Sequence, residues 1–220
     1  MILEIDNVEL WLKDKRILHG IYLKAKKGEV TGVLGSNGSG KSCLLKIIFG
    51  HLTPKYKLIR IDNKPITKAF YKTKLVAYLP QQYFSPKNLK IKKLFKFLKV
   101  DWQEFTSLFS DFSKYYNSKI NKLSGGEQRV SETYLVLKGP HKIVSLDEPF
   151  SHLSPHYIEY FINLIKTIKS SKIIILTDHI YQYIINISDK LYLLENGYSR
   201  EINDLEDLKF YKYVSENTML

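Results

Sequence analysis

The chain contains a single cysteine, Cys43, among 220 residues, so it can form no internal disulfide bond. Disulfides belong to oxidising compartments, and one thiol agrees with a reducing cytoplasm. Long hydrophobic runs are also missing, since none approaches the roughly 18 residues that a membrane-spanning helix requires. The N-terminus has no basic start followed by an apolar stretch, so we expect no signal peptide. Hydrophobic residues still make up 44%, which excludes intrinsic disorder.

Negative charge is scarce, with 22 acidic against 34 basic residues and a net charge of +12. This excess is compatible with a polyanionic partner such as nucleic acid, a nucleotide or an anionic membrane surface. It also fits a lysine-rich proteome, because lysine outnumbers arginine and Ile, Tyr, Asn and Phe are abundant. We favour the second explanation, so the charge alone assigns no partner.

The length suits one or at most two domains, and the pattern of apolar residues predicts an α/β fold. The first thirty residues alternate apolar and polar positions, which predicts two strands joined by a turn near residues 13–15. Further on, short apolar runs alternate with helical patterns, which favours a largely parallel sheet covered by helices. The expected strands are 30–34, 59–61, 75–79, 143–146, 173–177 and 191–194, and the expected helices are 41–49, 126–138, 155–169 and 180–187.

The pattern changes between residues 86 and 123. Apolar residues at i, i+3, i+4 and i+7 predict a helix over residues 91–98, with lysines on its other face. A second helix begins at Asp101, an N-cap with Glu104 three residues later, and extends towards Phe112. We expect a small helical insert with a core made mostly from its own aromatic residues, which are Phe95, Phe97, Trp102, Phe105, Phe109, Phe112, Tyr115 and Tyr116.

The segment 35–42, Gly-Ser-Asn-Gly-Ser-Gly-Lys-Ser, fits the phosphate-loop pattern G-x-x-x-x-G-K-[ST] between a predicted strand and a predicted helix. Its glycines let backbone N–H groups approach phosphates, and the helix N-terminus favours anions. Lys41 reaches the β- and γ-phosphates in such loops, and the Ser42 hydroxyl ligates Mg²⁺. The expected nucleotide contacts are Gly35, Ser36, Asn37, Gly38, Ser39, Gly40, Lys41, Ser42 and Cys43.

Two carboxylates, Asp147 and Glu148, follow the predicted buried strand 143–146. In doubly wound sheets, ligands lie at the carboxyl ends of the strands. We expect Asp147 to hold Mg²⁺, directly or through water, and Glu148 to accept a proton from the attacking water. Acidic residues also end strands for solubility, so it is the accompanying phosphate loop that favours the functional interpretation.

The segment 123–128, Leu-Ser-Gly-Gly-Glu-Gln, places a serine and two glycines at a predicted helix start, which suits a second anion-binding terminus. The same residues also fit a plain capping box, with Ser124 as the N-cap and Glu127 three residues later. Physical reasoning alone leaves both interpretations open.

Together these motifs resemble those of the ATP-binding cassette (ABC) family, whose signature motif is Leu-Ser-Gly-Gly-Glu-Gln. The resemblance covers nearly the whole chain, from about Leu3 to the turn at Gly197 and a little beyond. Leu-Pro-Gln at 79–81 resembles the Q-loop, which implies that Gln81 senses Mg²⁺ beside the γ-phosphate. Thr-Asp-His at 177–179 resembles the switch loop, which implies that His179 contacts the γ-phosphate, although a lone histidine is more often structural. The resemblance thus implies a catalytic set of Glu148, His179 and Gln81 and a Mg²⁺ set of Ser42, Gln81 and Asp147.

The resemblance implies a P-loop NTPase fold with a mostly parallel central sheet, an N-terminal antiparallel β subdomain and a small helical insert. One domain would span residues 1–220, with a nucleotide-binding core at 1–82 and 139–220 and the insert at about 83–138. In this family each ATP lies between the phosphate loop of one subunit and the signature of another. The resemblance therefore implies a second ABC subunit, and we expect a homodimer rather than a heterodimer. The residues implied to contact the partner's ATP are Ser124, Gly125, Gly126 and Glu127.

Two positions depart from the family pattern. The loop after the two carboxylates commonly ends in aspartate, but Ser154 stands at that place, which implies weaker cross-talk between two ATP sites. The family also stacks an aromatic side chain on adenine. An ungapped reading puts Leu12 at that position, and we prefer Trp11, one residue away, if the loop shifts. Neither departure touches the hydrolytic residues, so we expect an active ATPase.

The leading expectation is the energy-supplying subunit of an ABC transporter, with ATP and Mg²⁺ as cofactors. Because the chain has no membrane span of its own, a separate integral membrane permease would provide the path. The permease would dock between the Q-loop and the insert, where Tyr83, Phe84 and the aromatic residues within 95–112 could line a groove. The expected location is cytoplasmic, peripheral on the inner face of the cell membrane. The lysines within 87–99 would face anionic lipid or simply solvent, and we favour solvent.

Two alternatives come from other functional classes. One is a soluble ABC ATPase that acts on nucleic acid, which only the charge of +12 supports. Such proteins usually carry coiled-coil, zinc or second-cassette insertions that this chain lacks, so we do not expect a nucleic-acid partner. The other is a soluble assembly ATPase, similar to the cassette subunit of iron–sulfur cluster machinery. Neither alternative alters the expected ATP chemistry.

Overall fold

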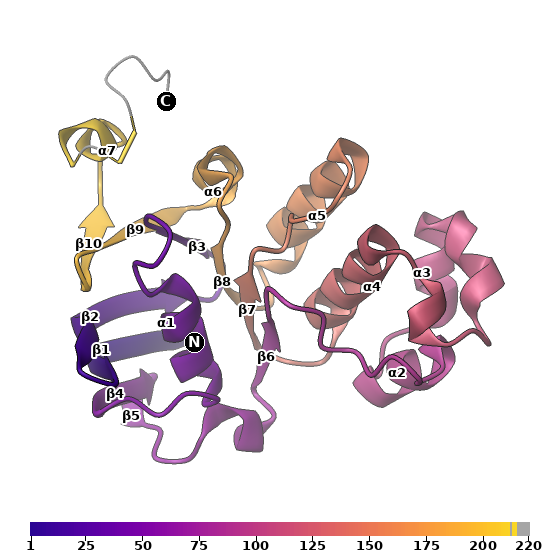
Figure 1. Ribbon diagram of the computed structural model, residues 1–220, viewed down its shortest axis with the longest axis horizontal. Coiled ribbons are helices and arrows are strands. Elements are labelled where there is room, and N and C mark those ends of the chain that lie inside the picture. The colour runs from indigo at the N-terminus through magenta and orange to yellow at the C-terminus, as the bar shows by residue number, and fades with distance from the viewer. Residues whose placement is uncertain (212, 215–220) are drawn as a thin grey trace.

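The computed structural model describes residues 1–211, 213 and 214, which form two β-sheets flanked by helices (Figure 1). The smaller sheet is antiparallel, with the strand order β2-β1-β4-β5. It arises from the alternating N-terminal pattern, because Leu3 and Ile5 point to the same face and are fully buried. The expected turn joins its two long strands. The bounds are β1 (Ile2–Leu12), β2 (Lys15–Lys26), β4 (Tyr56–Ile61) and β5 (Lys64–Pro65).

The larger sheet has the order β10-β9-β3-β8-β7-β6, and every neighbouring pair from β9 to β6 is parallel. Only β10 is antiparallel, and the turn from β9 uses Asn196 and Gly197, with φ angles of 49° and 80°. The three central strands are buried on both faces, as their continuous apolar runs predict. The bounds are β3 (Val30–Leu34), β6 (Val76–Leu79), β7 (Ile143–Asp147), β8 (Ile173–Thr177), β9 (Lys190–Glu195) and β10 (Tyr198–Ile202).

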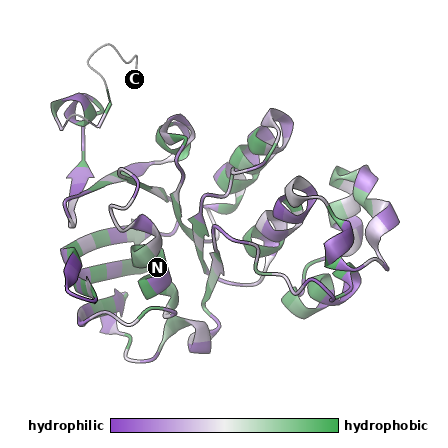
Figure 2. Cartoon of the chain, viewed as in Figure 1, coloured by the Kyte–Doolittle hydropathy of each residue, from purple (hydrophilic) through white to green (hydrophobic). Residues whose placement is uncertain are grey.

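Helices cover both faces of the larger sheet, and their apolar sides point inwards (Figures 1 and 2). Strand β8 separates two cores: Ile173 and Ile175 share one with α1 and the smaller sheet, whereas Ile174 and Leu176 share the other with α4, α5 and α6. The confirmed alternation of strands and helices therefore produces three layers. The bounds are α1 (Lys41–Phe49), η1 (Phe70–Thr73), α4 (Gly125–Lys138), α5 (Pro155–Ile168), α6 (Tyr181–Ile187) and α7 (Glu206–Phe210).

The segment between β6 and β7 contains the predicted helices and an aromatic core of its own. The Phe105 ring lies about 5 Å from those of Phe95, Phe112 and Tyr134, with centroid distances of 4.9, 5.0 and 4.9 Å. Of the eight aromatic residues expected here, Phe97 and Tyr116 are 81% and 44% exposed. Four are buried and two half-buried: Phe95, Phe105, Phe109 and Phe112, and Trp102 and Tyr115. The bounds are α2 (Ile91–Leu98), α3 (Trp102–Leu108), η2 (Ser110–Tyr115) and η3 (Ile120–Lys122).

The structure differs from the predicted elements in several places, and the short elements β5, η1, η2 and η3 were not predicted. The helix predicted from Asp101 towards Phe112 ends at Leu108, because Phe109 leaves the helical region with φ −127° and ψ 72°. Its ring packs instead on Tyr160 of α5, with centroids 4.8 Å apart. Strand β10 and helix α7 lie beyond the last predicted element. Within the part of the chain that the structure describes, no helix combines the length and apolarity needed to cross a bilayer.

Candidate functional site

The phosphate-loop segment forms a tight turn between β3 and the start of α1. Gly38 and Gly40 have φ angles of 81° and 103°, which residues with a Cβ adopt only with strain. The Lys41 ammonium donates to the carbonyl oxygens of Gly35 and Ser36 at 2.6 and 3.0 Å, so it folds over the loop. Burial lowers the pKa of Lys41, and the carboxylates at the end of β7 oppose that effect. The ammonium of Lys41 therefore lies against the backbone of its own loop.

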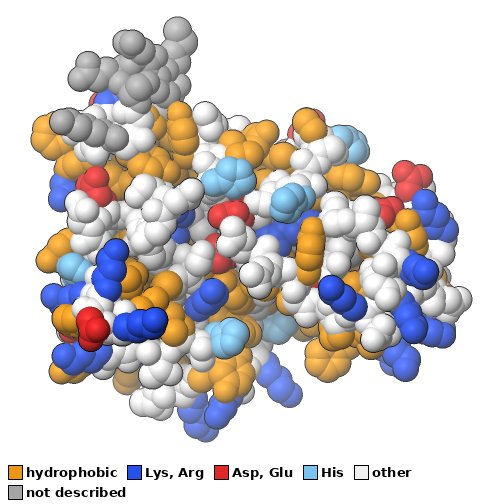
Figure 3. Space-filling view, viewed as in Figure 1, with side chains coloured by type: hydrophobic (Ala, Val, Ile, Leu, Met, Phe, Trp, Pro, Cys, Tyr) orange, Lys and Arg blue, Asp and Glu red, His pale blue; other side chains and the backbone are white. Residues whose placement is uncertain are grey.

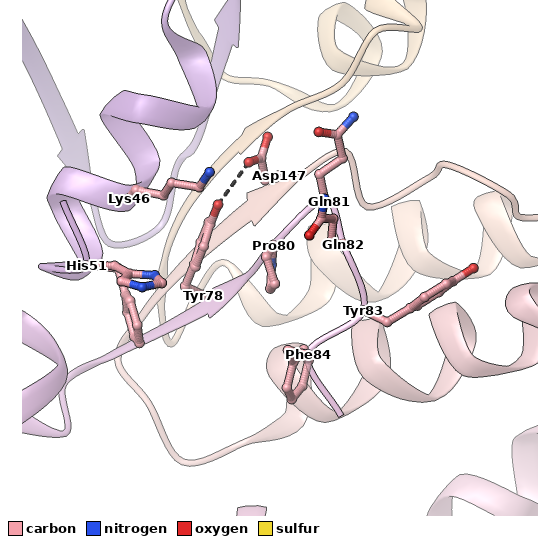
Figure 4. Close-up of a pocket in the computed structure, with 10 residues that line it drawn as sticks. Lys46, His51, Tyr78, Pro80, Gln81, Gln82, Tyr83, Phe84 and Asp147 are labelled. Carbon is pink, nitrogen blue, oxygen red and sulfur yellow. Dashed lines mark hydrogen bonds between the residues drawn. The ribbon is translucent and has the colours of Figure 1, made fainter. Parts of the chain in front are cut away.

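Asp147 ends β7 and is only 1% exposed. Its carboxylate accepts two hydrogen bonds: Oδ1 from the Ser42 hydroxyl at 3.0 Å, and Oδ2 from the Tyr78 hydroxyl at 2.9 Å (Figure 4). Burial raises the pKa of Asp147, and both hydrogen bonds oppose the rise because they stabilise the charged form. The fold thus joins Ser42 to a carboxylate 105 residues away.

The other two predicted hydrolytic residues, Gln81 and His179, both lie beside the Glu148 carboxylate. Its φ of 52° is an uncommon backbone conformation of the kind that clusters at functional sites. Its Oε2 accepts hydrogen bonds from Gln81 Nε2 and Ser151 Oγ, both at 3.1 Å. His179 Nδ1 lies 3.6 Å from the same oxygen and 3.2 Å from Asp178 Oδ1. Three segments far apart in the sequence, at residues 81, 148–151 and 178–179, therefore meet at one carboxylate.

A cavity of about 540 Å³ opens between the phosphate loop and Glu148. It is lined by Leu12, Ile17, Asn37, Gly38, Gly40, Lys41, Ser42, Cys43, Gln81, Glu148 and His179. Of the other predicted phosphate-loop contacts, Gly35, Ser36 and Ser39 do not line it. Asp147 lines a neighbouring cavity with Tyr78 and Gln81 (Figure 4). Figure 3 shows acidic and histidine side chains exposed near the middle of one face of the molecule.

Arg129 of α4 is a site residue that the sequence interpretation missed. It is 1% exposed, and its guanidinium donates to the carbonyl oxygens of Pro80 at 2.7 Å, of Asp147 at 2.8 Å and of Glu148. Burial lowers the pKa of Arg129, yet a guanidinium stays charged in proteins. The sequence carries no signal for this role, because an arginine beside Gln128 looks like an ordinary polar helix position.

The signature segment begins α4 with the expected capping box. Glu127 N donates to Ser124 Oγ at 3.3 Å, and Ser124 N donates to Glu127 Oε2 at 2.8 Å. The Tyr115 hydroxyl donates to the other oxygen, Glu127 Oε1, at 2.9 Å, so both oxygens of this carboxylate are engaged. Among the described residues, none from 124–127 lines the phosphate-loop cavity. The signature therefore lies away from the phosphate loop of its own chain.

Leu12, rather than Trp11, lines the cavity, together with Ile17 beyond the β1–β2 turn. The Trp11 indole N–H donates to Glu9 Oε1 at 2.9 Å, and the ring lies 5.9 Å from the Lys55 ammonium. Successive side chains of a strand point to opposite faces, so the side chains of Trp11 and Leu12 lie on different faces of β1. The cavity lining therefore favours the ungapped position, Leu12, and a contact between Trp11 and adenine stays a prediction that depends on a shift of the loop.

The oxygen atoms of Ser42 and Asp147 fit Mg²⁺, a hard cation that takes oxygen ligands. Within residues 1–211, 213 and 214, no three His, Cys, Asp or Glu side chains gather into a metal cage. Mg²⁺ commonly combines one or two carboxylates with substrate phosphates. The residues present therefore suit Mg²⁺ in company with a phosphate-bearing ligand.

A family model described as ABC transporter matches residues 18–151, which is more than half of the chain. The chain belongs to the ABC transporter family. LivF, a probable branched-chain amino acid transport ATP-binding protein of Archaeoglobus fulgidus, is 33% identical over 199 residues, which cover 84% of each chain. BraG, a high-affinity branched-chain amino acid transport ATP-binding protein of Pseudomonas aeruginosa, is 26% identical over 209 residues, covering 89% of this chain and 90% of BraG.

Solved structures of ABC proteins share the fold. An ATP-binding subunit of an ABC transporter superposes with a TM-score of 0.83 at 20% identity, covering 99% of this chain and 96% of its own. A dimeric ATP-binding cassette in a post-hydrolysis state with ADP and Pi superposes with a TM-score of 0.76 at 20% identity, covering 92% and 100%. The family resemblance is confirmed, and the chain is an ATP-binding and ATP-hydrolysing subunit of an ABC transporter.

The cavity lining predicts different effects for two adjacent substitutions. Leu12→Ala removes apolar surface beside the nucleotide, and a partial loss of about 1 kcal/mol weakens ATP affinity roughly fivefold. Trp11→Ala leaves the affinity within about twofold, because its ring lies outside the cavity. Calorimetric titration with ATP measures both variants against the wild type. A larger loss in Trp11→Ala than in Leu12→Ala would return the tryptophan to the adenine site.

Proposed function

We propose that the chain binds Mg²⁺-ATP in this cavity and hydrolyses it as one half of a dimer that drives a separate membrane permease. One observation carries the proposal: the cavity joins the phosphate loop to Gln81, Glu148 and His179 but takes no lining residue from 124–127 among the described residues. The chain thus has one phosphate loop and one signature that do not meet. A second subunit supplies the missing half of each site.

The phosphate loop binds the triphosphate through backbone N–H groups from Gly35 to Cys43. Lys41 turns from the carbonyl oxygens it now contacts towards the β- and γ-phosphates, and stabilises their charge. The adenine packs on the aliphatic side chains of Leu12 and Ile17, which line the cavity together with the loop. This arrangement recognises the phosphates by charge and the base by apolar contact.

Ser42 and Asp147 hold the Mg²⁺, with Gln81 beside them. The Ser42 hydroxyl at the start of α1 and Asp147 Oδ1 at the end of β7 lie 3.0 Å apart. The cation, when bound, neutralises charge on the β- and γ-phosphates. Gln81 also donates to Glu148, so it joins the metal side of the site to the hydrolytic side.

Glu148 acts as the general base. Water attacks the γ-phosphorus, the bond to the β–γ bridging oxygen breaks, and the water proton passes to the Glu148 carboxylate. Gln81 and Ser151 hold that carboxylate in place through their hydrogen bonds. His179, half exposed on the cavity wall, contacts the γ-phosphate. Arg129 acts behind them, since it fixes the backbone of Glu148.

Glu148→Gln tests this assignment. The amide cannot accept the proton, so turnover falls at least ~10²-fold while ATP affinity persists. Phosphate release and calorimetric titration measure the two quantities separately. Lys41→Ala is the contrasting variant, because it loses ATP affinity as well. Normal turnover in Glu148→Gln would remove Glu148 from the role of base.

The partner subunit is a second copy of this chain in our proposal. Ser124, Gly125, Gly126 and Glu127 begin α4, and the first three present a hydroxyl and backbone N–H groups to the partner's γ-phosphate. Glu127 serves the same contact indirectly, because its carboxylate caps the helix start. Ser154 in place of an aspartate weakens the cross-talk between the two sites. The dimeric relative with ADP and Pi supports this arrangement by its fold.

Mixed dimers test the composite site. Lys41→Ala removes the phosphate-loop lysine, and Ser124→Asp keeps an N-cap residue while adding a charge that repels phosphate. Each variant alone is inactive, because both of its sites contain the defect. In a mixture, one site of each mixed dimer has an intact phosphate loop and an intact signature, so about a quarter of wild-type activity returns if the variants pair at random and the sites act independently. A mixture as inactive as its components would contradict shared sites.

The permease docks in the groove between the core and the helical insert. Tyr83 and Phe84 line the cavity there, and a neighbouring apolar groove is lined in part by Tyr71 and Phe97, which are 46% and 81% exposed. Exposed aromatic side chains are enriched at interfaces. We propose that residues 83–138 form one helical unit beside the core at 1–82 and 139–220. The subunit would lie on the cytoplasmic face of the membrane, held by this contact.

Co-purification tests the transport role. The tagged chain, isolated from gently solubilised native membranes, brings down a polytopic membrane protein in stoichiometric amount. A Phe97→Asp variant, which changes one exposed groove residue, lowers that yield while its ATPase activity stays at the wild-type level. Recovery of the tagged chain in the soluble fraction with nucleic acid or soluble partners, and no permease, would support the soluble alternatives and overturn the transport role.

A further inference from the structure

Tyr78 lies on β6, the strand that neighbours β7 at the edge of the parallel sheet. In the strand register Tyr78 stands opposite Ser145, and Asp147 lies two residues further along β7 on the same face. The Tyr78 hydroxyl reaches diagonally across the two strands and donates to Asp147 Oδ2 at 2.9 Å (Figure 4). The hydroxyl therefore touches the carboxylate that the proposed function assigns to Mg²⁺.

Asp147 is held from two sides by different donors. The Ser42 hydroxyl donates to Oδ1 and the Tyr78 hydroxyl donates to Oδ2, so the rotation of the carboxylate is fixed at both oxygens. A phenol hydroxyl is a donor at neutral pH, so Tyr78 can hold Oδ2 in this orientation. Ser42 is itself a proposed Mg²⁺ ligand, whereas the Tyr78 hydroxyl contacts only Oδ2 of Asp147.

The ring of Tyr78 has a separate environment from its hydroxyl. It packs on Phe49 with centroids 5.5 Å apart, and it lines both the cavity of Figure 4 and the apolar groove that Phe84 and Phe97 also line. A phenylalanine would fill that space equally well. Among the described residues, the hydrogen-bond partner of the Tyr78 hydroxyl is Asp147.

We propose that Tyr78 is a positioning residue for Mg²⁺, which acts by orienting the Asp147 carboxylate. The inference deepens the proposed function and rests on it. Outer partners that orient a metal-binding carboxylate tune metal affinity strongly, and their loss commonly weakens it ten- to a hundredfold. Because the ring lines the proposed permease groove, Tyr78 also connects the groove to the metal site through one rigid side chain.

The test compares Tyr78→Phe with Tyr71→Phe. Both substitutions remove one phenol oxygen, and both rings pack on Phe49, but Tyr71 makes no contact with Asp147. Electron paramagnetic resonance measures Mn²⁺ affinity of each protein in complex with the non-hydrolysable analogue AMP-PNP. ATP affinity in EDTA is measured by calorimetry, and the Mg²⁺ concentration for half-maximal ATPase activity is recorded beside it.

We expect Tyr78→Phe to weaken Mn²⁺ affinity about tenfold and to raise the half-maximal Mg²⁺ concentration, with ATP affinity in EDTA unchanged. Tyr71→Phe should match the wild type in all three measurements. Unchanged Mn²⁺ affinity in Tyr78→Phe, or an equal loss in Tyr71→Phe, would overturn the proposal alone. A loss of ATP affinity in EDTA that accounts for the whole effect would also overturn it, in favour of a packing role. A wild-type complex that binds no Mn²⁺ would instead overturn the proposed metal site itself.

Discussion

The buried guanidinium of Arg129 is the contact on which the arrangement of this site depends. It donates to the carbonyl oxygens of Pro80, Asp147 and Glu148, which belong to the start of the Q-loop and to the end of β7. A charge that is 1% exposed is tolerated only when such partners satisfy it. Because Arg129 directly follows the signature segment, the same contact holds the start of α4 in a defined position against the hydrolytic residues.

Parallel strands explain why the remaining groups converge. The strands β3, β8 and β7 run in the same direction, so the phosphate loop, the switch loop and the carboxylates all follow strand ends at one edge of the sheet. Hydrogen bonds then align the loops: Asp178 accepts from the N–H groups of Phe150 and Ile180, and Thr177 donates to the Val33 carbonyl oxygen. A ligand bound at this edge therefore lies beside several loops at once.

Because the signature lies apart from the phosphate loop of its own chain, each ATP of the proposed dimer contacts both subunits. A nucleotide that contacts two subunits stabilises the associated state, and its hydrolysis removes that stabilisation. The helical insert contributes both the signature and one wall of the proposed permease groove, so movement between subunits and movement at the groove involve the same helices. Its aromatic core, centred on Phe105, packs these helices against one another.

The sequence by itself determined the family, the order of most strands and helices, and the contiguous motifs at 35–42, 123–128 and 143–148, because local spacing carries these features. Tertiary structure decided which side chains meet. Whether Leu12 or Trp11 faces the cavity depends on strand direction, since one residue of shift reverses the face. Helix α3 ends before Phe109, whose ring packs on Tyr160 of a distant helix. The register of β6 and β7 places the Tyr78 hydroxyl within hydrogen-bonding distance of Asp147. Such contacts join residues far apart in the chain, and no local pattern encodes them.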